Sequence, residues 1–281
     1  MRAEYLIPGL TFLLITTVSA IPILCCTVFT VTSPDEDKVF FGSNEDWDLT
    51  LSNNYIWFFP SIGAKHGMAF VGYKYNNHEW DGFPMGGINT AGLCFDRNAL
   101  ALTSIKVDSS KPNWPQDPLI ETLEKCSSVD EVISLFKFYR TWKLWIEQIH
   151  FADATGDAVI IGPGDESTLA FTRKGNGSYL VSTNWNVVYP EYNIADPCWR
   201  YNTATTMLDN ITSKGDLTIE SVQNVLNATH QEGEYVYTLY SNIYDLKNRD
   251  IYLYHYHNFE KVASMDNNQH KPIDPKVNVY L

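Results

Sequence analysis

The sequence predicts an α+β fold in which antiparallel β-sheets are layered with helices. Segments with the two-residue alternation of strands and segments with helical spacing follow one another in the order strands, helices, strands, helices, strands. Short turns separate neighbouring strands, which favours antiparallel pairing, because parallel strands need long crossover connections. No repeat, low-complexity tract or linker interrupts residues 26–281, so we predict one domain over this range.

Strands are expected throughout the first part of this domain. β-branched and aromatic runs at Thr27–Val31 and Val39–Gly42 flank an acidic turn, which indicates a hairpin. Tyr55–Phe59 and Met68–Tyr75 have the composition of further strands. The glycine-rich segment Gly86–Gly92 is expected to form a turn.

The rest of the domain continues the alternation. After a proline-rich loop, two helices are predicted, the second of which begins with a capping box at Ser128–Glu131. Turn residues predict two more hairpins, and two more helices precede a final pair of strands. In chain order, the expected hairpins are Ile146–Asp153 with Ala158–Ile161 and Leu169–Arg173 with Tyr179–Thr183, the later helices are Tyr201–Asn210 and Ile219–Thr229, and the last strands are Tyr235–Tyr244 and Asp250–His257.

Residues 1–25 have the pattern of an export leader. Arg2 is followed by the apolar run Leu6–Val18 and by a small-residue cleavage site that ends at Ala20. The run is too short and too poorly flanked for a membrane span. Cleavage after Ala20 would leave a short propeptide, whereas cleavage after Cys25 would expose Cys26 as the first residue. We therefore expect a secreted, periplasmic or otherwise exported protein without a stable membrane span in its mature form.

The composition excludes some partners. The formal net charge of −13 argues against nucleic-acid binding. The hydrophobic fraction of 44% is enough for a sizeable buried core. A homo-oligomer is compatible with the sequence but not specified by it.

Cysteine use leaves the redox state open. Removal of the leader would leave an even number of cysteines, which in an exported protein could form two disulfides. If Cys26 stays free as a nucleophile, at most one pair can form among the remaining three. No Cys or His pattern has the spacing of a metal site, so we predict neither a metal nor a cofactor. The four cysteines are Cys26, Cys94, Cys126 and Cys198.

Cys26 is the first candidate for chemistry. The thiolate is the reactive form of cysteine, and a free thiol with a pKa of ~8.5 is mostly protonated at neutral pH. If Cys26 becomes the N-terminal residue, its own α-amine, with a pKa of ~7.7–8.0, can accept the thiol proton. Cys26 would then be nucleophile and base at once. A buried or bonded structural cysteine is the alternative interpretation.

Asp46 is a candidate partner for that amine. It follows a predicted strand in which alternation puts Asn44 and Asp46 on one face and Glu45 and Trp47 on the other. If Cys26 begins the neighbouring strand of the hairpin, a carboxylate at position 46 can orient the amine and stabilise its protonated form. An acidic turn residue is the alternative.

Two further polar residues stand at element ends. Asn184 ends a predicted strand, where a side-chain amide can donate to an oxyanion, an effect of about 2.7–4 kcal/mol, or can form an Asx turn. Arg200 lies at a predicted helix start, where a cation opposes the helix dipole, so we expect a charge partner for it. That partner could be a thiolate, an acyl carboxylate or the acid of a plain salt bridge. His150, between apolar residues of a strand, is interpreted as a core histidine.

Taken together, these segments resemble the N-terminal-nucleophile (Ntn) hydrolases of the choloylglycine hydrolase and penicillin V acylase kind. They also resemble the related acyltransferases and acid-ceramidase-like linear amide hydrolases. The resemblance extends from Cys26 to near Lys261 and implies a four-layer αββα sandwich of two antiparallel sheets. It rests on Cys26-Thr27, Gly42–Trp47, Gly87–Asn89 with Gly92-Leu93, Asp153–Gly156, Thr183-Asn184, Arg200-Tyr201 and Thr238–Ser241.

The resemblance also implies roles for individual residues. Cys26 would be the nucleophile and, through its amine, the base, while Asp46 would position the amine. Asn184 would supply the oxyanion hole and Arg200 would support the thiolate, with Asn98 as a second oxyanion or substrate contact. Ser43 stands where the bile-salt and penicillin V enzymes carry an arginine. That departure favours the acyltransferase-like branch.

The resulting hypothesis is an exported amidase that hydrolyses a linear, non-peptide N-acyl amide through an acyl-enzyme on Cys26. Two alternatives stay open. The acyl group could be passed to an amine instead of water, or the chain could be an inactive secreted binding protein on the same scaffold. A small-molecule substrate is expected, and the sequence specifies neither its acyl group nor its amine.

Overall fold

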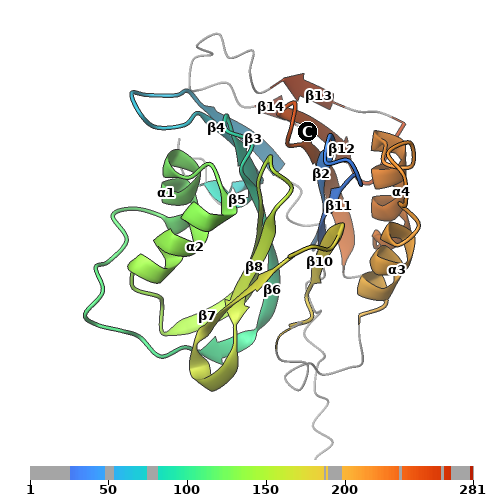
Figure 1. The fold of residues 1–281 in the computed structure, drawn as a ribbon. Helices are drawn as coiled ribbons and strands as arrows, with labels where there is room; N and C mark the ends of the chain where they lie inside the picture. The colour runs from blue at the N-terminus through green and yellow to red at the C-terminus, as the bar shows by residue number, and fades with distance from the viewer. Residues whose placement is uncertain are drawn as a thin grey trace, which may run out of the picture.

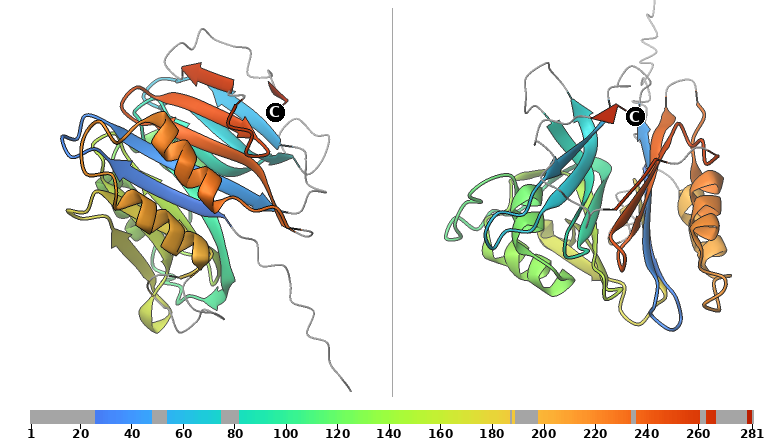
Figure 2. Two further views of the ribbon diagram at one scale, coloured as in Figure 1. Left: turned by 90° about the vertical axis from the view of Figure 1, so that its right-hand side faces the viewer. Right: turned by 90° about the horizontal axis from the view of Figure 1, so that it is seen from above.

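Two facing β-sheets, each covered on its outer side by helices, form the protein (Figure 1). The computed structural model describes residues 26–47, 54–74, 82–186, 188, 198–233, 236–260, 263–266 and 279–280. Seen from above, the layers stack as helix, sheet, sheet, helix (Figure 2). Neighbouring strands pair antiparallel in both sheets, so the predicted α+β fold with its αββα layering is confirmed.

The first sheet has six strands in the order β10-β1-β2-β11-β12-β13, which places the N-terminal strand in its interior. Its strands are β1 (Thr27–Thr32), β2 (Val39–Trp47), β10 (Tyr179–Thr183), β11 (Tyr237–Asp245), β12 (Asp250–His255) and β13 (Ala263–Asp266).

The second sheet has eight strands in the order β14-β3-β4-β5-β6-β7-β8-β9. Except for β14, they follow one another along the chain as a meander. The strands are β3 (Asn54–Phe59), β4 (Met68–Lys74), β5 (Gly82–Asn89), β6 (Cys94–Ser104), β7 (Leu144–Ala152), β8 (Ala158–Pro163), β9 (Leu169–Arg173) and β14 (Val279–Tyr280).

Four helices among the described residues cover the outer faces of the two sheets. α1 (Pro118–Lys125) and α2 (Val129–Phe138) lie on the eight-stranded sheet, and α3 (Trp199–Leu208) and α4 (Ile219–Thr229) lie on the six-stranded sheet (Figure 1). The capping box predicted at Ser128 is present, because its side chain accepts from the Glu131 N–H and its own N–H donates to the Glu131 carboxylate. A short 3₁₀ turn at Asp165–Ser167 precedes β9.

Alternation along β1 shows how the layers are built. Val28 packs between the two sheets, whereas Phe29 packs outward among apolar residues of α3 and α4. A third apolar cluster joins α1 and α2 to the outer face of the eight-stranded sheet. The four layers therefore enclose three hydrophobic interfaces, and the central one holds the two sheets together.

Several predicted elements are confirmed. The β1–β2 hairpin, the β7–β8 hairpin and the closing β11–β12 pair all form. The helix predicted at Ile219–Thr229 has those bounds as α4, and the helix predicted at Tyr201–Asn210 is α3, which begins and ends two residues earlier.

Two predictions are wrong. Gly86–Gly92 is not a single turn, because Gly86–Asn89 continues β5 and only the residues up to Gly92 reverse the chain. Glycine is required inside β5 because a Cβ on Gly86 would lie 2.5 Å from the carboxylate of Asp96. The segments Leu169–Arg173 and Tyr179–Thr183 form no hairpin: β9 pairs with β8, and β10 pairs with β1 in the other sheet. The turn between them reverses the chain without specifying which sheet receives the second strand.

The proposed leader, residues 1–25, lies outside the described residues. Among the helices that are described, none combines the length and the apolar character that crossing a membrane would require.

Candidate active site

The register of three strands places Cys26 beside two of the predicted site residues. Cys26 directly precedes β1, in which Thr27 pairs with Asn44 of β2 and with Thr183 of β10. The antiparallel register then brings the end of β2, with Asp46, and the residue after β10, Asn184, to the same end of the sheet. β1 therefore begins at the end of the sheet where its two neighbours, β2 and β10, end.

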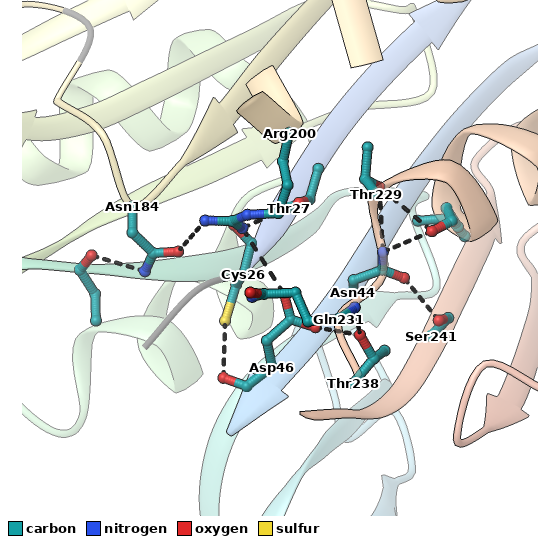
Figure 3. A network of polar contacts seen from close by, with 12 residues as sticks. Cys26, Thr27, Asn44, Asp46, Asn184, Arg200, Thr229, Gln231, Thr238 and Ser241 are labelled. Carbon is teal, nitrogen blue, oxygen red and sulfur yellow. Dashed lines mark hydrogen bonds and ion pairs between the residues drawn. The ribbon is translucent and has the colours of Figure 1, made fainter. Parts of the chain in front are cut away.

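Arg200 connects these residues from the helix layer (Figure 3). It lies in the first turn of α3, is 2% exposed, and donates from Nη1 to the backbone oxygen of Cys26 at 2.6 Å. Its Nη2 donates to Oδ1 of Asn184 at 3.4 Å, and Nη1 lies 3.8 Å from Oδ2 of Asp46. The predicted charge partner of Arg200 is thus a carboxylate, and a single guanidinium contacts Cys26, Asp46 and Asn184.

The carboxylate of Asp46 is held by two further side chains. The Thr238 hydroxyl donates to Oδ1, and the Gln231 amide donates to Oδ2 at 3.0 Å (Figure 3). Thr238 and Gln231 are tied to each other, because the Gln231 N–H donates to the Thr238 hydroxyl at 2.8 Å. Complete burial raises the pKa of Asp46 to about 7, although Arg200 and the two hydrogen bonds oppose this shift.

The sulfur of Cys26 is buried, with the residue 1% exposed, and lies 3.9 Å from the backbone oxygen of Asp46. Burial, reinforced by the carboxylates of Glu45 and Asp46, holds the pKa of this thiol well above its usual range. The described cysteines Cys26, Cys94, Cys126 and Cys198 are all free thiols. While residue 25 is attached, the Cys26 nitrogen is an amide, so the thiol has no base on its own residue.

Asn184 follows β10 and faces both the guanidinium and the second sheet. Its Nδ2 donates to the backbone oxygen of Ala99 in β6 at 2.8 Å. Asn98, next to Ala99, is fully buried, and neither end of its amide has a partner in the described part of the chain. Gln148, which pairs with Asn98 across β6 and β7, donates to the carbonyls of Thr183 and Trp185 on either side of Asn184. Asn98 therefore faces the Asn184 end of the site with unused hydrogen-bonding capacity.

The predicted alternation along the end of β2 is confirmed. Asn44 points to the helix layer, where its Nδ2 donates to the Leu226 carbonyl at 2.9 Å, and it accepts from Ser241. Glu45 points the other way, into the space between the sheets, and accepts a hydrogen bond from Tyr73 of β4.

A second carboxyl lies in the inter-sheet space with Glu45. Asp96 of β6 is fully buried, and burial raises its pKa to about 7. Burial and the proximity of Asp96 likewise raise the pKa of Glu45 well above its ordinary value. Oε2 of Glu45 and Oδ2 of Asp96 have no hydrogen-bond partner in the described residues. Two carboxyls with raised pKa values therefore lie between the sheets, and one of them, Glu45, is next to Asp46 in β2.

His150 has the structural role that we expected. Its ring nitrogens are hydrogen-bonded to the hydroxyls of Thr30 and Ser182 at 3.0 Å each, and complete burial lowers its pKa to about 3. A neutral imidazole engaged on both sides is unsuited to act as the general base for Cys26.

The comparisons with known proteins agree with this geometry. The family described as acyl-coenzyme A:6-aminopenicillanic acid acyl-transferase matches residues 32–259, more than half of the chain. The chain belongs to this acyltransferase family. The match begins inside β1, after Cys26, so the family assignment rests on the scaffold and not on the candidate nucleophile.

Solved structures of Ntn hydrolases share the fold of this acyltransferase-family chain. Two variants of conjugated bile acid hydrolase from Clostridium perfringens have TM-scores of 0.66, at 15% and 16% sequence identity, over 88% of this chain and 93–94% of theirs. Penicillin V acylase from Agrobacterium tumefaciens has a TM-score of 0.63 at 16% identity, over 87% of each chain. None of the curated proteins shows significant sequence similarity. The choloylglycine hydrolase and penicillin V acylase-like Ntn fold is thus established.

Sequence reasoning missed part of the site of this acyltransferase-family member. Thr238 belongs to a segment that the resemblance includes, so a signal for it existed, although it carried no assigned role. Gln231 lies in the connection after α4, where nothing in the sequence marks it as a carboxylate partner. Asp96 comes shortly after the turn expected at Gly86–Gly92 and was assigned no role, because only the facing of the two sheets brings it toward Glu45.

Proposed function

We propose that the chain is an exported amidase that hydrolyses a linear N-acyl amide and uses Cys26 as its nucleophile. The observation that carries this proposal is the convergence of Asp46, Asn184 and Arg200 around Cys26 at one end of the six-stranded sheet. Their scaffold has the fold of two amide hydrolases, conjugated bile acid hydrolase and penicillin V acylase.

Processing is the activating step in this proposal. Cleavage of the peptide bond between residues 25 and 26 converts the amide nitrogen of Cys26 into an α-amine with a pKa of ~7.7–8.0. That amine takes the thiol proton and so supplies the base that the uncut chain lacks. The carboxylate of Asp46, fixed by Thr238 and Gln231, orients the resulting ammonium.

The reaction then has two halves. The Cys26 thiolate attacks the acyl carbonyl, the oxyanion accepts from the Asn184 amide, and the amine leaves with a proton from the α-ammonium as the C–N bond breaks. Water, deprotonated by the α-amine, attacks the thioester, and the acid departs while the thiol is regenerated. Asn98, whose buried amide has no partner in the described residues, supplies a second donor to the oxyanion or holds the substrate amide.

Acyl transfer to an amine is the second candidate, and the family assignment favours it. The matching family is described as an acyltransferase. In addition, this chain has Ser43 at the position where the bile-salt and penicillin V enzymes carry an arginine. Both reactions share the same acyl-enzyme on Cys26. They differ in whether water or an amine takes the acyl group, so the product ratio in the presence of a competing amine separates them.

Mass spectrometry of the mature protein tests the proposal. We expect a chain that begins at Cys26 and that gains one acyl group when it is treated with a panel of N-acyl amides, namely fatty amides, acyl lactones, phenoxyacetyl amides and bile-acid conjugates. Cys26→Ser should abolish turnover, whereas Cys126→Ser, which changes another buried thiol, should retain it. A mature chain that begins at Ile21 and forms no adduct would instead identify an inactive binding protein.

A further inference from the structure

Three side chains of the kinds that bind metals, His230, Glu232 and His257, lie close together. They lie next to Gln231, whose side-chain amide donates to Asp46. His230 and Glu232 follow α4, and His257 follows β12. One ligand atom from each lies within 4.8 Å of the others. Oε1 of Glu232 is 2.9 Å from Nε2 of His257 and 3.6 Å from Nε2 of His230. Both Nε2 atoms thus lie near the same carboxylate oxygen.

The His230 imidazole is held in place from behind. Nδ1 of His230 is hydrogen-bonded to the backbone carbonyl of Asn227. A carbonyl only accepts, so Nδ1 carries the proton and Nε2 keeps its lone pair. Metal-binding histidines are oriented by the same kind of hydrogen bond behind the ligating nitrogen. The two rings stack with centroids 4.2 Å apart and planes at 25°, and the Nε2 atoms of both rings lie near Oε1 of Glu232.

The backbone turns sharply to bring His257 to this position. Tyr256 and His257 both have positive φ angles, 48° and 50°. Bulky residues rarely adopt this conformation, and such strain persists where the surrounding structure requires it. The Tyr256 N–H donates to the Leu239 carbonyl of β11 at 3.0 Å, which fixes the turn against the sheet that carries the site.

We propose that His230, Glu232 and His257 bind a divalent transition metal of the zinc class. Two imidazole nitrogens and one carboxylate oxygen are ligands that zinc prefers, whereas calcium and magnesium prefer sites made of oxygen. The remaining coordination positions are open to water, because His257 also lines a surface groove with Asn224 and Asn227 of α4. The sequence spacing indicated no metal site because the third ligand, His257, follows β12 and is far along the chain from the other two.

A small closing movement completes the coordination. The three ligand atoms now lie within 4.8 Å of one another. Zinc–nitrogen bonds of about 2.0–2.1 Å require them to be closer together. Glu232, whose side chain is 56% exposed, has the freedom to close this distance.

The metal would also stiffen the support of Asp46. Gln231 lies between two of the ligands, and its amide donates to Asp46 while its backbone pairs with Thr238 in both directions. Fixing His230 and Glu232 to His257 restrains the residue between them. Slower exchange of the Gln231 and Thr238 amide protons should accompany metal binding, and this readout does not depend on any enzymatic activity.

Calorimetric titration of the full chain with Zn²⁺ tests the site. We expect one ion per chain and a rise in Tm, with affinity at least tenfold lower in Glu232→Gln and His257→Ala. His255→Ala, which changes an exposed histidine at the end of β12, should leave the affinity unchanged. Ca²⁺ and Mg²⁺ should not compete.

Three results would overturn the proposal. One is the absence of saturable zinc binding, and another is an equal affinity in the wild type, Glu232→Gln and His255→Ala. The third is loss of binding in Cys26→Ser, which would identify the thiol as the ligand. Because Glu232 is exposed, the Glu232→Gln variant is expected to fold and keeps the test decisive even if His257→Ala unfolds. None of these results depends on whether Cys26 acts as the nucleophile.

Discussion

The guanidinium of Arg200 donates a hydrogen bond of 2.6 Å to the backbone carbonyl oxygen of Cys26. This carbonyl belongs to the peptide bond that leads into β1, on the opposite side of Cys26 from the proposed cleavage point. Arg200 therefore anchors the residue from its carboxyl side. Removal of residues 1–25 would leave that anchor intact, so the precursor and the mature protein can share one arrangement of the site.

Arg200→Met should destabilise the protein by about 3–5 kcal/mol, because it leaves the buried Asp46 without its cation and the Cys26 carbonyl without its donor. The loss should be larger at pH 8 than at pH 5. Asp46 can accept a proton at the lower pH and no longer needs a charge partner. Urea denaturation at the two pH values measures both effects.

Arg173→Met is the matched control for this change. Arg173 also forms ion pairs, with Asp130 and Asp157, but its side chain is 43% exposed. Exposed pairs contribute little, so the free energy of unfolding should fall by less than about 1 kcal/mol. Equal losses in the two variants would show that Arg200 acts as an ordinary surface cation.

Asp46→Asn should lower kcat/KM by about 10²-fold while the protein stays folded, because the amide cannot orient the α-ammonium as a carboxylate does. Loss of a negative charge beside the amine also makes the amine easier to deprotonate. The acidic limb of the pH–rate profile should therefore move to lower pH. An unchanged profile would contradict the positioning role.

Two substitutions of Thr238 distinguish positioning of the Asp46 carboxylate from simple packing. Thr238→Ser keeps the hydroxyl that donates to Asp46 and should retain most of the activity. Thr238→Val keeps the shape but removes the donor, and should lower kcat more than it raises KM. Thr238→Ser should be more active than Thr238→Val with every substrate in the panel, since neither substitution is expected to change the acyl pocket.

The positions of Cys26 and Asp46 show which contacts local sequence patterns can predict. The hairpin of β1 and β2 was predictable from two β-branched runs around an acidic turn, and alternation correctly placed Asn44 and Glu45 on opposite faces. Within a hairpin, register follows from the chain itself. Proximity of residues 26 and 46 was therefore within reach of the sequence.

Contacts between separate sheets were not predictable in this way. β9 and β10 have a turn between them and still enter different sheets, because turn chemistry defines a reversal and not a partner. The facing of Glu45 and Asp96 depends on how the two sheets pack. Such packing joins residues from strands that are neighbours neither in sequence nor in a hairpin.

Asp96→Asn should stabilise the uncut protein at pH 8 and have little effect at pH 4. Burial raises the pKa of Asp96 to about 7, against ~3.9 in the unfolded chain. Between these values the folded state keeps a proton that the unfolded state releases, so stability falls as the pH rises through this window. Asparagine removes the penalty, which is on the order of 2–4 kcal/mol at pH 8 for this shift.

Asp35→Asn controls for a general charge effect. The pKa of Asp35 is lowered to about 2 by hydrogen bonds from Lys214 and Ser33, so it stays ionised in both states above pH 5. Its removal should alter the stability equally at pH 6 and pH 8. If Asp35→Asn and Asp96→Asn gave parallel pH dependences, burial of Asp96 would not be the cause.

Gly92→Ala should destabilise the protein more than Gly63→Ala, although both glycines have positive φ angles, 86° and 62°. Both substitutions place a side chain in a left-handed conformation, which costs about 1 kcal/mol. Only at Gly92 does the new Cβ also meet backbone, 2.5 Å from the Leu246 carbonyl oxygen, whereas Gly63 has nothing within 4 Å. Leu246 follows β11, so this contact joins a turn of one sheet to a turn of the other. Overpacking at Gly92 should add about 1–3 kcal/mol to the loss of stability. Urea denaturation measures the free energy of unfolding of both variants. Equal losses at the two positions would show that the backbone moves apart at this contact without cost.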